Sequence, residues 1–129
     1  MDRTVLLIED NEQNRYLATF LLERHGYTVT CASDGRRGIE LARANRPALI
    51  LLDIQLPELD GYAVARALRA DPALRDTPIL AITSYAMAGD REKALSAGCN
   101  GYFEKPINPE TFAADVGRFL QPQEEKGMP

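Results

Sequence analysis

Three runs composed mainly of apolar residues stand out along the chain. Their ranges are 4–8, 48–53 and 78–82. Each run has the length of a strand and is bounded by polar or turn residues, which predicts strands buried on both faces of a sheet. The second run ends in an acid, Asp53, and is followed by Pro57 and by the turn pair Asp60-Gly61. Such a strand places a carboxylate at the end of the sheet where the strand finishes.

Two weaker patterns predict further strands. Residues 28–32 alternate polar and apolar side chains, which indicates one wetter face and favours an edge position. Residues 101–104 form a short run that ends at Lys105-Pro106. Apolar residues with helical spacing fill the intervals between strands. The predicted helices span 11–25, 35–45, 61–70, 90–97 and 109–120.

The first and last helices have apolar faces that predict how they pack. The first is expected to turn four residues towards the core, namely Leu17, Phe20, Leu21 and Arg24. The last is expected to begin with Asn108 as its cap and Pro109 in its first position. Its predicted core residues are Phe112, Val116, Phe119 and Leu120.

Strands that alternate regularly with helices indicate an α/β fold: a doubly wound, five-stranded parallel sheet with five helices. Placing the amphipathic second strand at an edge and the three apolar strands inside gives the flavodoxin-like order 2-1-3-4-5. The dinucleotide-binding order would move the most apolar strand outwards and scatter the acids. We expect one domain over residues 1–121 and a flexible tail over 122–129.

Composition narrows the possible functions. The 129 residues are 45% hydrophobic and 26% charged, with a net charge of −4, which argues against a nucleic-acid-binding surface. No apolar run is long enough to span a membrane, and the N-terminal residues lack a signal-peptide pattern. We therefore expect a cytoplasmic protein without nucleic-acid or membrane partners. Cys31 and Cys99 are expected to be reduced and partly buried.

Chemically active side chains follow four of the five predicted strands. They are Glu9, Asp10, Asp53, Thr83 and Lys105. In the order 2-1-3-4-5 the three acids converge at one crevice, where their mutual repulsion calls for a cation. Hard oxygen ligands without an encircling loop suit Mg²⁺ better than Ca²⁺ or zinc. With Mg²⁺ and Lys105 beside it, Asp53 has the surroundings of a nucleophile that carries a phosphoryl group.

The combination of motifs resembles the receiver domains of two-component response regulators, over residues 4–120. The matching residues are Glu9-Asp10-Asn11, Asp53-Ile54-Gln55-Leu56-Pro57 with Asp60-Gly61, Thr83-Ser84, and Tyr102 with Lys105-Pro106. Finer features, such as Thr83-Ser84-Tyr85-Ala86-Met87 and Ala97-Gly98-Cys99, look most like single-domain regulators of the DivK type.

This resemblance implies a role for each site residue. Asp53 would accept a phosphoryl group from a phosphohistidine. Mg²⁺ would bind Asp10, Asp53 and the backbone carbonyl of Gln55 directly, and Glu9 mostly through water. Lys105 would contact the phosphoryl group, and the bond from Lys105 to Pro106 is expected to be cis.

The resemblance also implies a switch. Thr83 and the backbone of Ser84 would bind phosphoryl oxygens, and Tyr102 would move inwards with Thr83. The face formed by the fourth helix, fifth strand and fifth helix would then be read by a downstream protein. The phosphodonor would be a sensor histidine kinase or a histidine phosphotransfer protein. Residues Gln55 and Tyr85 would set the lifetime of the phosphoryl group, which is expected to be long.

We therefore expect a phosphorylation-dependent signalling module that is not an enzyme, beyond promoting its own phosphorylation and dephosphorylation. Two alternatives stay open, a docking module that never needs phosphate and a receiver segment of a hybrid histidine kinase. A phosphohydrolase acting on small molecules is disfavoured because position 55 is Gln rather than a second acid. A nucleotide or flavin protein is disfavoured because acids, not glycines, follow the first strand.

Overall fold

In the computed structural model, which describes residues 2–84 and 88–120, five parallel strands form one sheet. They are β1 (Thr4–Ile8), β2 (Thr28–Ala32), β3 (Leu49–Asp53), β4 (Ile79–Thr83) and β5 (Gly101–Glu104). Their order across the sheet is β2-β1-β3-β4-β5, which confirms the predicted topology. The predicted tail over 122–129 lies outside the described residues.

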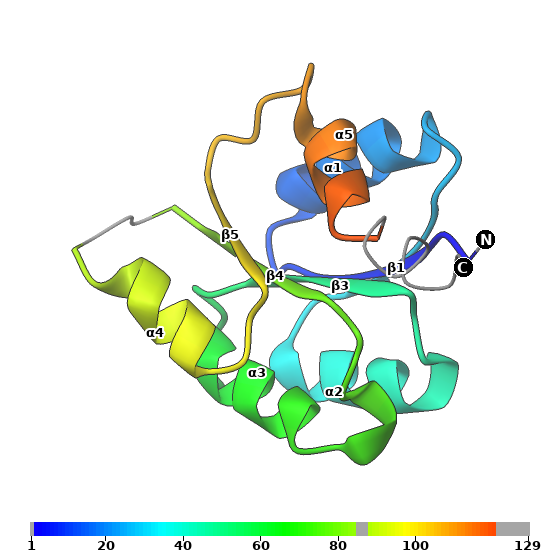
Figure 1. Ribbon diagram of the computed structural model, residues 1–129. Helices are drawn as coiled ribbons and strands as arrows, with labels where there is room; N and C mark the ends of the chain where they lie inside the picture. The colour runs from blue at the N-terminus through cyan, green and yellow to red at the C-terminus, as the bar shows by residue number, and fades with distance from the viewer. Residues whose placement is uncertain (1, 85–87, 121–129) are drawn as a thin grey trace, which may run out of the picture.

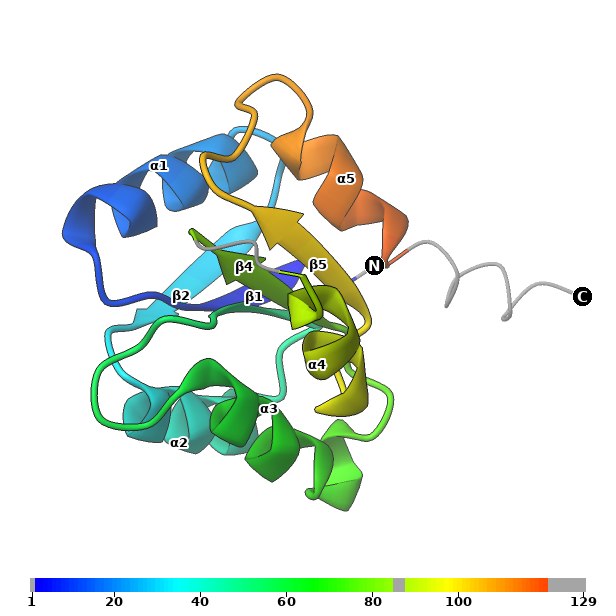
Figure 2. The same ribbon diagram turned by 90° about the vertical axis from the view of Figure 1, so that its left-hand side faces the viewer.

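Helices cover both faces of this sheet, as Figures 1 and 2 show. Their bounds are α1 (Glu12–Glu23), α2 (Gly35–Asn45), α3 (Gly61–Arg69), α4 (Asp90–Ser96) and α5 (Phe112–Arg118), with a 3₁₀ turn, η1, at Pro72–Leu74. Helices α1 and α5 lie on one face, and α2, α3 and α4 lie on the other. The described helices are all too short or too polar to cross a membrane.

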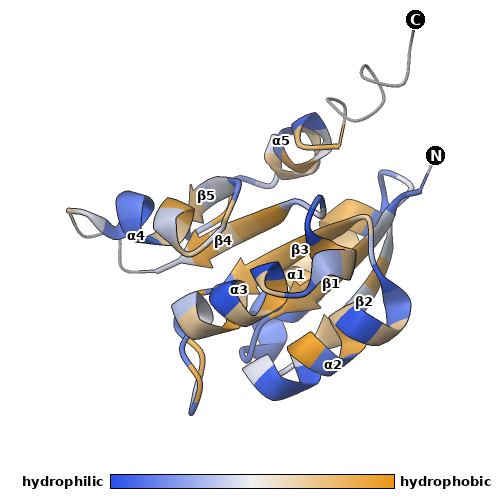
Figure 3. Cartoon of the chain, turned by 60° about the horizontal axis from the view of Figure 1, so that its bottom comes forward, coloured by the Kyte–Doolittle hydropathy of each residue, from blue (hydrophilic) through white to orange (hydrophobic). Residues whose placement is uncertain are grey.

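The central strands supply the core of the protein. Every residue of β3 and of β4 is buried, which explains why both sequences are apolar up to the polar residue that ends each strand. Alternate side chains enter two separate apolar clusters: Ile50 and Leu52 pack towards α2 and α3, whereas Leu49 and Leu51 pack towards α1 and α5. Strand β2 has three exposed residues and lies at the edge, as its alternating pattern predicts. Figure 3 shows the contrast between the apolar strands and the mixed helices.

The predicted core face of α1 is wrong by about one residue. The helix buries Ala18, Leu21 and Leu22, whereas Leu17 and Phe20 are 37% and 45% exposed. Arg24 follows the helix at the surface, with its guanidinium 5.5 Å from the ring centre of Phe20. Because α1 has apolar residues around most of its circumference, helical spacing did not define one face, and packing against the sheet selected it.

Two other local predictions need correction. Asn108 does not cap α5: its side chain accepts a hydrogen bond from the Glu110 amide, 2.9 Å away, and the helix begins only at Phe112. An Asn side chain that bonds to the backbone two residues later forms a turn rather than a helix cap. Cys31 is exposed on the edge strand, while Cys99 is buried, and both are free thiols.

Candidate functional site

The three predicted acids meet at the carboxyl ends of β1 and β3. Glu9, Asp10 and Asp53 each offer a carboxylate oxygen, and these oxygens lie within 4.8 Å of one another. Glu9 and Asp53 are buried, whereas Asp10 is exposed. The sequence prediction that these residues converge is thus confirmed, because parallel strands β1 and β3 are direct neighbours in register. Two carboxylates of the site are therefore buried, and one is exposed to solvent.

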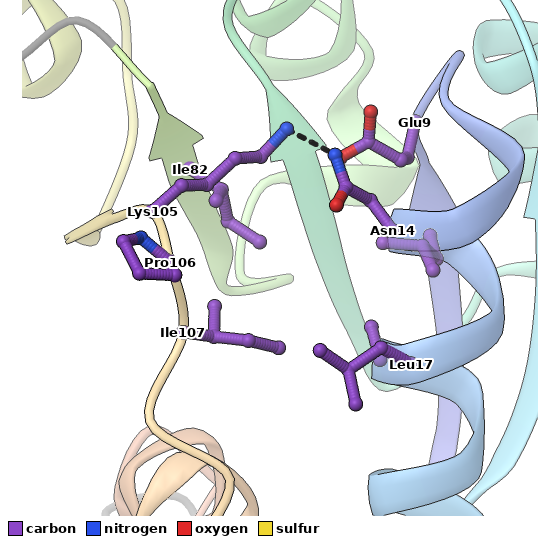
Figure 4. Close-up of a pocket in the computed structure, with 9 residues that line it drawn as sticks. Glu9, Asn14, Leu17, Ile82, Lys105, Pro106 and Ile107 are labelled. Atoms are coloured by element: carbon purple, nitrogen blue, oxygen red, sulfur yellow. Dashed lines mark ion pairs between the residues drawn. The ribbon is translucent and has the colours of Figure 1, made fainter.

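Lys105 reaches this acidic cluster from the end of β5. Its Nζ atom lies 2.7 Å from Glu9 Oε1 and 3.2 Å from Asp53 Oδ2. Figure 4 shows the extended side chain pointing from its strand towards Glu9. The Lys105 amide donates to the Thr83 carbonyl at 2.8 Å, which holds the start of this segment against β4. The peptide bond from Lys105 to Pro106 is cis, as expected.

Burial and mutual repulsion change the proton affinities of the two inner acids. Burial, followed by the hydrogen bond and the repulsion from Glu9, raises the pKa of Asp53 to about 7. Burial also acts to raise the pKa of Glu9, but hydrogen bonds with Asp53 and Lys105 outweigh it and lower that pKa. Glu9 is therefore the carboxylate that Lys105 neutralises most directly, and Asp53 is the one that holds a proton more readily below about pH 7.

Gln55 links the end of β3 to the end of β4. Its side-chain nitrogen donates to the hydroxyl of Thr83, and its side-chain oxygen accepts from the Ser84 amide at 2.9 Å. Its own backbone amide donates to Asp53 Oδ1 at 2.9 Å. The family resemblance implies a metal-binding backbone carbonyl and an influence on phosphoryl lifetime for Gln55, but it does not predict these side-chain contacts, because nothing in a linear pattern shows where an amide side chain points.

Gly61 allows α3 to pack against the loop that follows Asp53. A Cβ atom at this position would lie 2.4 Å from Ile54 Cα and 2.7 Å from the Asp53 carbonyl oxygen. The preceding Asp60 caps α3 by accepting a hydrogen bond from the Ala63 amide at 2.9 Å. The pair Asp60-Gly61 therefore starts the helix and holds the chain close beneath Asp53.

Comparison with known proteins identifies this arrangement. Residues 5–116 match the family model of the response regulator receiver domain. The chain belongs to this family. Receiver domains are the phosphoacceptor modules of two-component signalling, and this receiver is 41% identical over 120 residues to the polar-differentiation response regulator DivK of Brucella anthropi. That match covers 93% of this chain and 98% of the length of the relative.

Solved structures agree with this family. The receiver domain of the sensor histidine kinase PA1611 from Pseudomonas aeruginosa, solved with a magnesium ion in its active-site cleft, is 37% identical and superposes with a TM-score of 0.86. It covers 94% of this chain and 99% of its own. The chemotaxis protein CheY4 of Vibrio cholerae is 29% identical, with a TM-score of 0.88, and covers 93% of this chain and 100% of its own.

The acidic cluster of this receiver has the donors that a hard divalent cation requires. One lysine cannot neutralise three carboxylates, and two such charges about 4 Å apart repel by roughly 4 kcal/mol at an effective dielectric constant of 20. Asp10 is open to solvent, so a cation bound there could keep several of its waters, as Mg²⁺ does in proteins. The residues present therefore fit Mg²⁺.

A small cavity lies beside the Glu9–Lys105 ion pair of the receiver, between α1 and the segment after β5 (Figure 4). Its volume is about 60 Å³, and Leu17 and Ile107 face each other across it. Most of its lining is apolar. Such surroundings keep water away from one side of the ion pair and so strengthen the attraction between its charges.

Tyr102, the predicted switch residue of the receiver, is half-buried on β5. Its ring packs against the apolar cluster beneath α3 and α4. Its hydroxyl is buried and finds no hydrogen-bond partner among the residues that the structure describes. The predicted inward movement stays a prediction. Tyr85, the other residue expected to affect phosphoryl lifetime, lies outside the described residues.

The raised pKa of Asp53 predicts a pH-dependent effect on the stability of the receiver. The pKa of Asp53 is about 7 in the folded protein but has its ordinary value of 3.8 in the unfolded chain. As the pH rises from 3.8 to about 7, the unfolded chain loses this proton before the folded protein does, so the free energy of unfolding progressively falls. Without Mg²⁺, Asp53→Asn should therefore be more stable than wild type at pH 8, by on the order of 2 kcal/mol, and nearly equal to it at pH 4.

Urea unfolding at both pH values measures this difference. Saturating Mg²⁺ should reverse the order at pH 8, because a cation that binds only the folded wild-type site stabilises it. Asp115 on α5 is half-buried and pairs at 3.3 Å with Arg118, not with the acidic cluster, so Asp115→Asn serves as the control for loss of one paired carboxylate. A difference that does not change between pH 4 and pH 8 would contradict the assignment of the proton to Asp53.

Proposed function

We propose that Asp53 accepts a phosphoryl group from a phosphohistidine. The observation that carries this proposal is the position of the Asp53 carboxylate, buried beside two further acids and 3.2 Å from Lys105 Nζ. A carboxylate oxygen attacks phosphorus, the bond from phosphorus to the histidine nitrogen breaks, and the imidazole leaves with the electron pair. The product is an acyl phosphate on Asp53.

Mg²⁺ is proposed to bind Asp10, Asp53 and the backbone carbonyl of Gln55 directly, with Glu9 acting through water. The magnesium ion in the PA1611 receiver supports this assignment. When bound, the cation offsets the charge that accumulates as the phosphoryl group approaches the cluster. Glu9 is proposed to act indirectly because Lys105 already occupies one of its oxygens at 2.7 Å.

The other site residues are proposed to hold the phosphoryl oxygens. Lys105 lies next to Asp53 and supplies a positive charge to one oxygen. The hydroxyl of Thr83 and the amide of Ser84 lie at the end of the adjacent strand β4 and supply hydrogen bonds to another. These residues also promote hydrolysis of the acyl phosphate, and we propose no enzymatic activity on other substrates.

The proposed output is a change in a protein-binding face. Thr83 pairs in register with Glu104, and Ala81 pairs with Tyr102, so β4 transmits a displacement of Thr83 directly to β5. Rearrangement of Thr83 and Tyr102 would repack the face formed by α4, β5 and α5, which a downstream protein would recognise. The proposed phosphodonor is a sensor histidine kinase or a histidine phosphotransfer protein.

Incubation with acetyl phosphate and Mg²⁺, followed by intact-mass measurement, tests the proposal. Wild-type protein should gain the mass of one phosphoryl group, and peptide mapping should place it on Asp53. Chelation of Mg²⁺ or the change Asp53→Asn should abolish the gain, whereas the control Asp34→Asn, at the end of β2, should leave it intact. A wild-type protein without the adduct, or an adduct on another residue, would refute Asp53 as the phosphoacceptor.

A further inference from the structure

The side chain of Gln55 contacts both groups that are proposed to bind the phosphoryl oxygens, and it occupies the only donor of one of them, the Ser84 amide. Its amide nitrogen donates to the Thr83 hydroxyl, and its amide oxygen accepts from the Ser84 backbone amide at 2.9 Å. Thr83 is buried, with 1% of its surface exposed, so its hydroxyl needs a partner within the protein. The primary amide meets both needs at once because it carries a donor and an acceptor.

Gln55 lies next to the phosphoacceptor, so its side chain competes with a phosphoryl group on Asp53 for the Ser84 amide. We call the two hydrogen bonds from the Gln55 side chain to Thr83 and Ser84 the bridge. The Gln55 backbone amide donates to Asp53 Oδ1 at 2.9 Å, so the bridge begins two residues from the reacting carboxylate. A phosphoryl group on Asp53 carries strong acceptor oxygens. It cannot accept from the Ser84 amide while the oxygen of Gln55 holds that amide, because the single N–H is already donated.

We propose that the Gln55 side chain is a positioning residue that holds Thr83 and Ser84 in their unphosphorylated arrangement and is displaced by the phosphoryl group. This inference rests on the proposed function of Asp53. The displaced amide can reach solvent because Gln55 is only half-buried and Ser84 is exposed. The bridge thus sets the balance between the two arrangements of the loop after β4 without taking part in the chemical step.

Removing the bridge should favour the phosphorylated arrangement. Gln55→Met keeps the length of the side chain but has neither the donor nor the acceptor. Its affinity for beryllofluoride, a tetrahedral mimic of the phosphoryl group, should rise about 5- to 30-fold at saturating Mg²⁺, since one or two hydrogen bonds no longer have to be exchanged. Gln55→Glu retains an acceptor for the Ser84 amide and so should preserve the contact with that amide.

The experiment combines two measurements on the full chain. Amide hydrogen exchange by NMR, without beryllofluoride or Mg²⁺, should show the Ser84 amide protected in wild type and in Gln55→Glu but exchanging faster in Gln55→Met. Titration with beryllofluoride then measures the affinity of each protein. Equal Ser84 exchange and equal beryllofluoride affinity in wild type and Gln55→Met would overturn the inference.

The two measurements separate this inference from the proposed function. If wild-type protein forms no Asp53 adduct with acetyl phosphate, the proposed function fails, although Ser84 exchange still reports whether the bridge exists. If the adduct forms on Asp53 but Gln55→Met leaves both readouts unchanged, only the role of Gln55 fails. If Gln55 merely stabilised the fold, Gln55→Met would lower the free energy of unfolding without raising the beryllofluoride affinity.

Discussion

Replacing Asp10 with asparagine is expected to weaken Mg²⁺ binding by at least about 100-fold, because the variant loses a charged ligand and the oxygens that remain are less attractive to a hard cation. Asp10 is the only one of the three clustered acids that is exposed. It is therefore the carboxylate that a hydrated ion meets first. Asparagine retains the size of the side chain, so the effect isolates the charge.

Titration of Mg²⁺ against the amide resonances of β1 and β3 would measure this loss. The formation of the acyl phosphate from acetyl phosphate should slow in parallel at physiological Mg²⁺ and recover partly at high Mg²⁺. Asp34→Asn is a matched control, because Asp34 lies at the same edge of the sheet and caps α2 through its oxygen, which asparagine also provides. Equal Mg²⁺ affinity in wild type and Asp10→Asn would remove Asp10 from the metal site.

Replacing Lys105 with methionine should slow acyl phosphate formation by about 10²- to 10³-fold, the usual cost of losing one group that stabilises developing charge. Lys105 is the one cation within ion-pair distance of Glu9 and Asp53 among the described residues. Methionine retains most of the apolar length of the side chain, which fills the space beside the small cavity next to the ion pair. The variant therefore tests the ammonium group rather than the packing.

The kinetic effect of Lys105→Met can be separated from metal binding. Loss of the ammonium leaves Glu9 and Asp53 without their neighbouring cation, so Mg²⁺ should bind at least as tightly as in wild type. Rates of adduct formation should thus be compared with each protein saturated in Mg²⁺. Lys93→Met, on the exposed side of α4, is the control. An unchanged rate in Lys105→Met would show that the lysine is a structural partner of Glu9 only.

The arrangement of the sheet was predictable because the burial of a strand constrains which of its residues are apolar. Strands β3 and β4 are covered on both faces, so nearly every position in them must be apolar, and the partly exposed β2 must alternate. Helix α1 shows the opposite case. Its sequence offers apolar residues on several sides, and only contact with the sheet decided that Ala18 and Leu22 face inwards while Phe20 remains exposed.

The amino-acid sequence by itself determined the order of the strands and the meeting of Glu9, Asp10 and Asp53 at one edge, since parallel strands must end on the same side. Only the tertiary structure decided which side chains pair there. Lys105 lies closest to Glu9, and Gln55 bridges Thr83 and Ser84. Such pairings depend on distances of a few ångströms between residues far apart in the chain, which strand and helix periodicity does not specify.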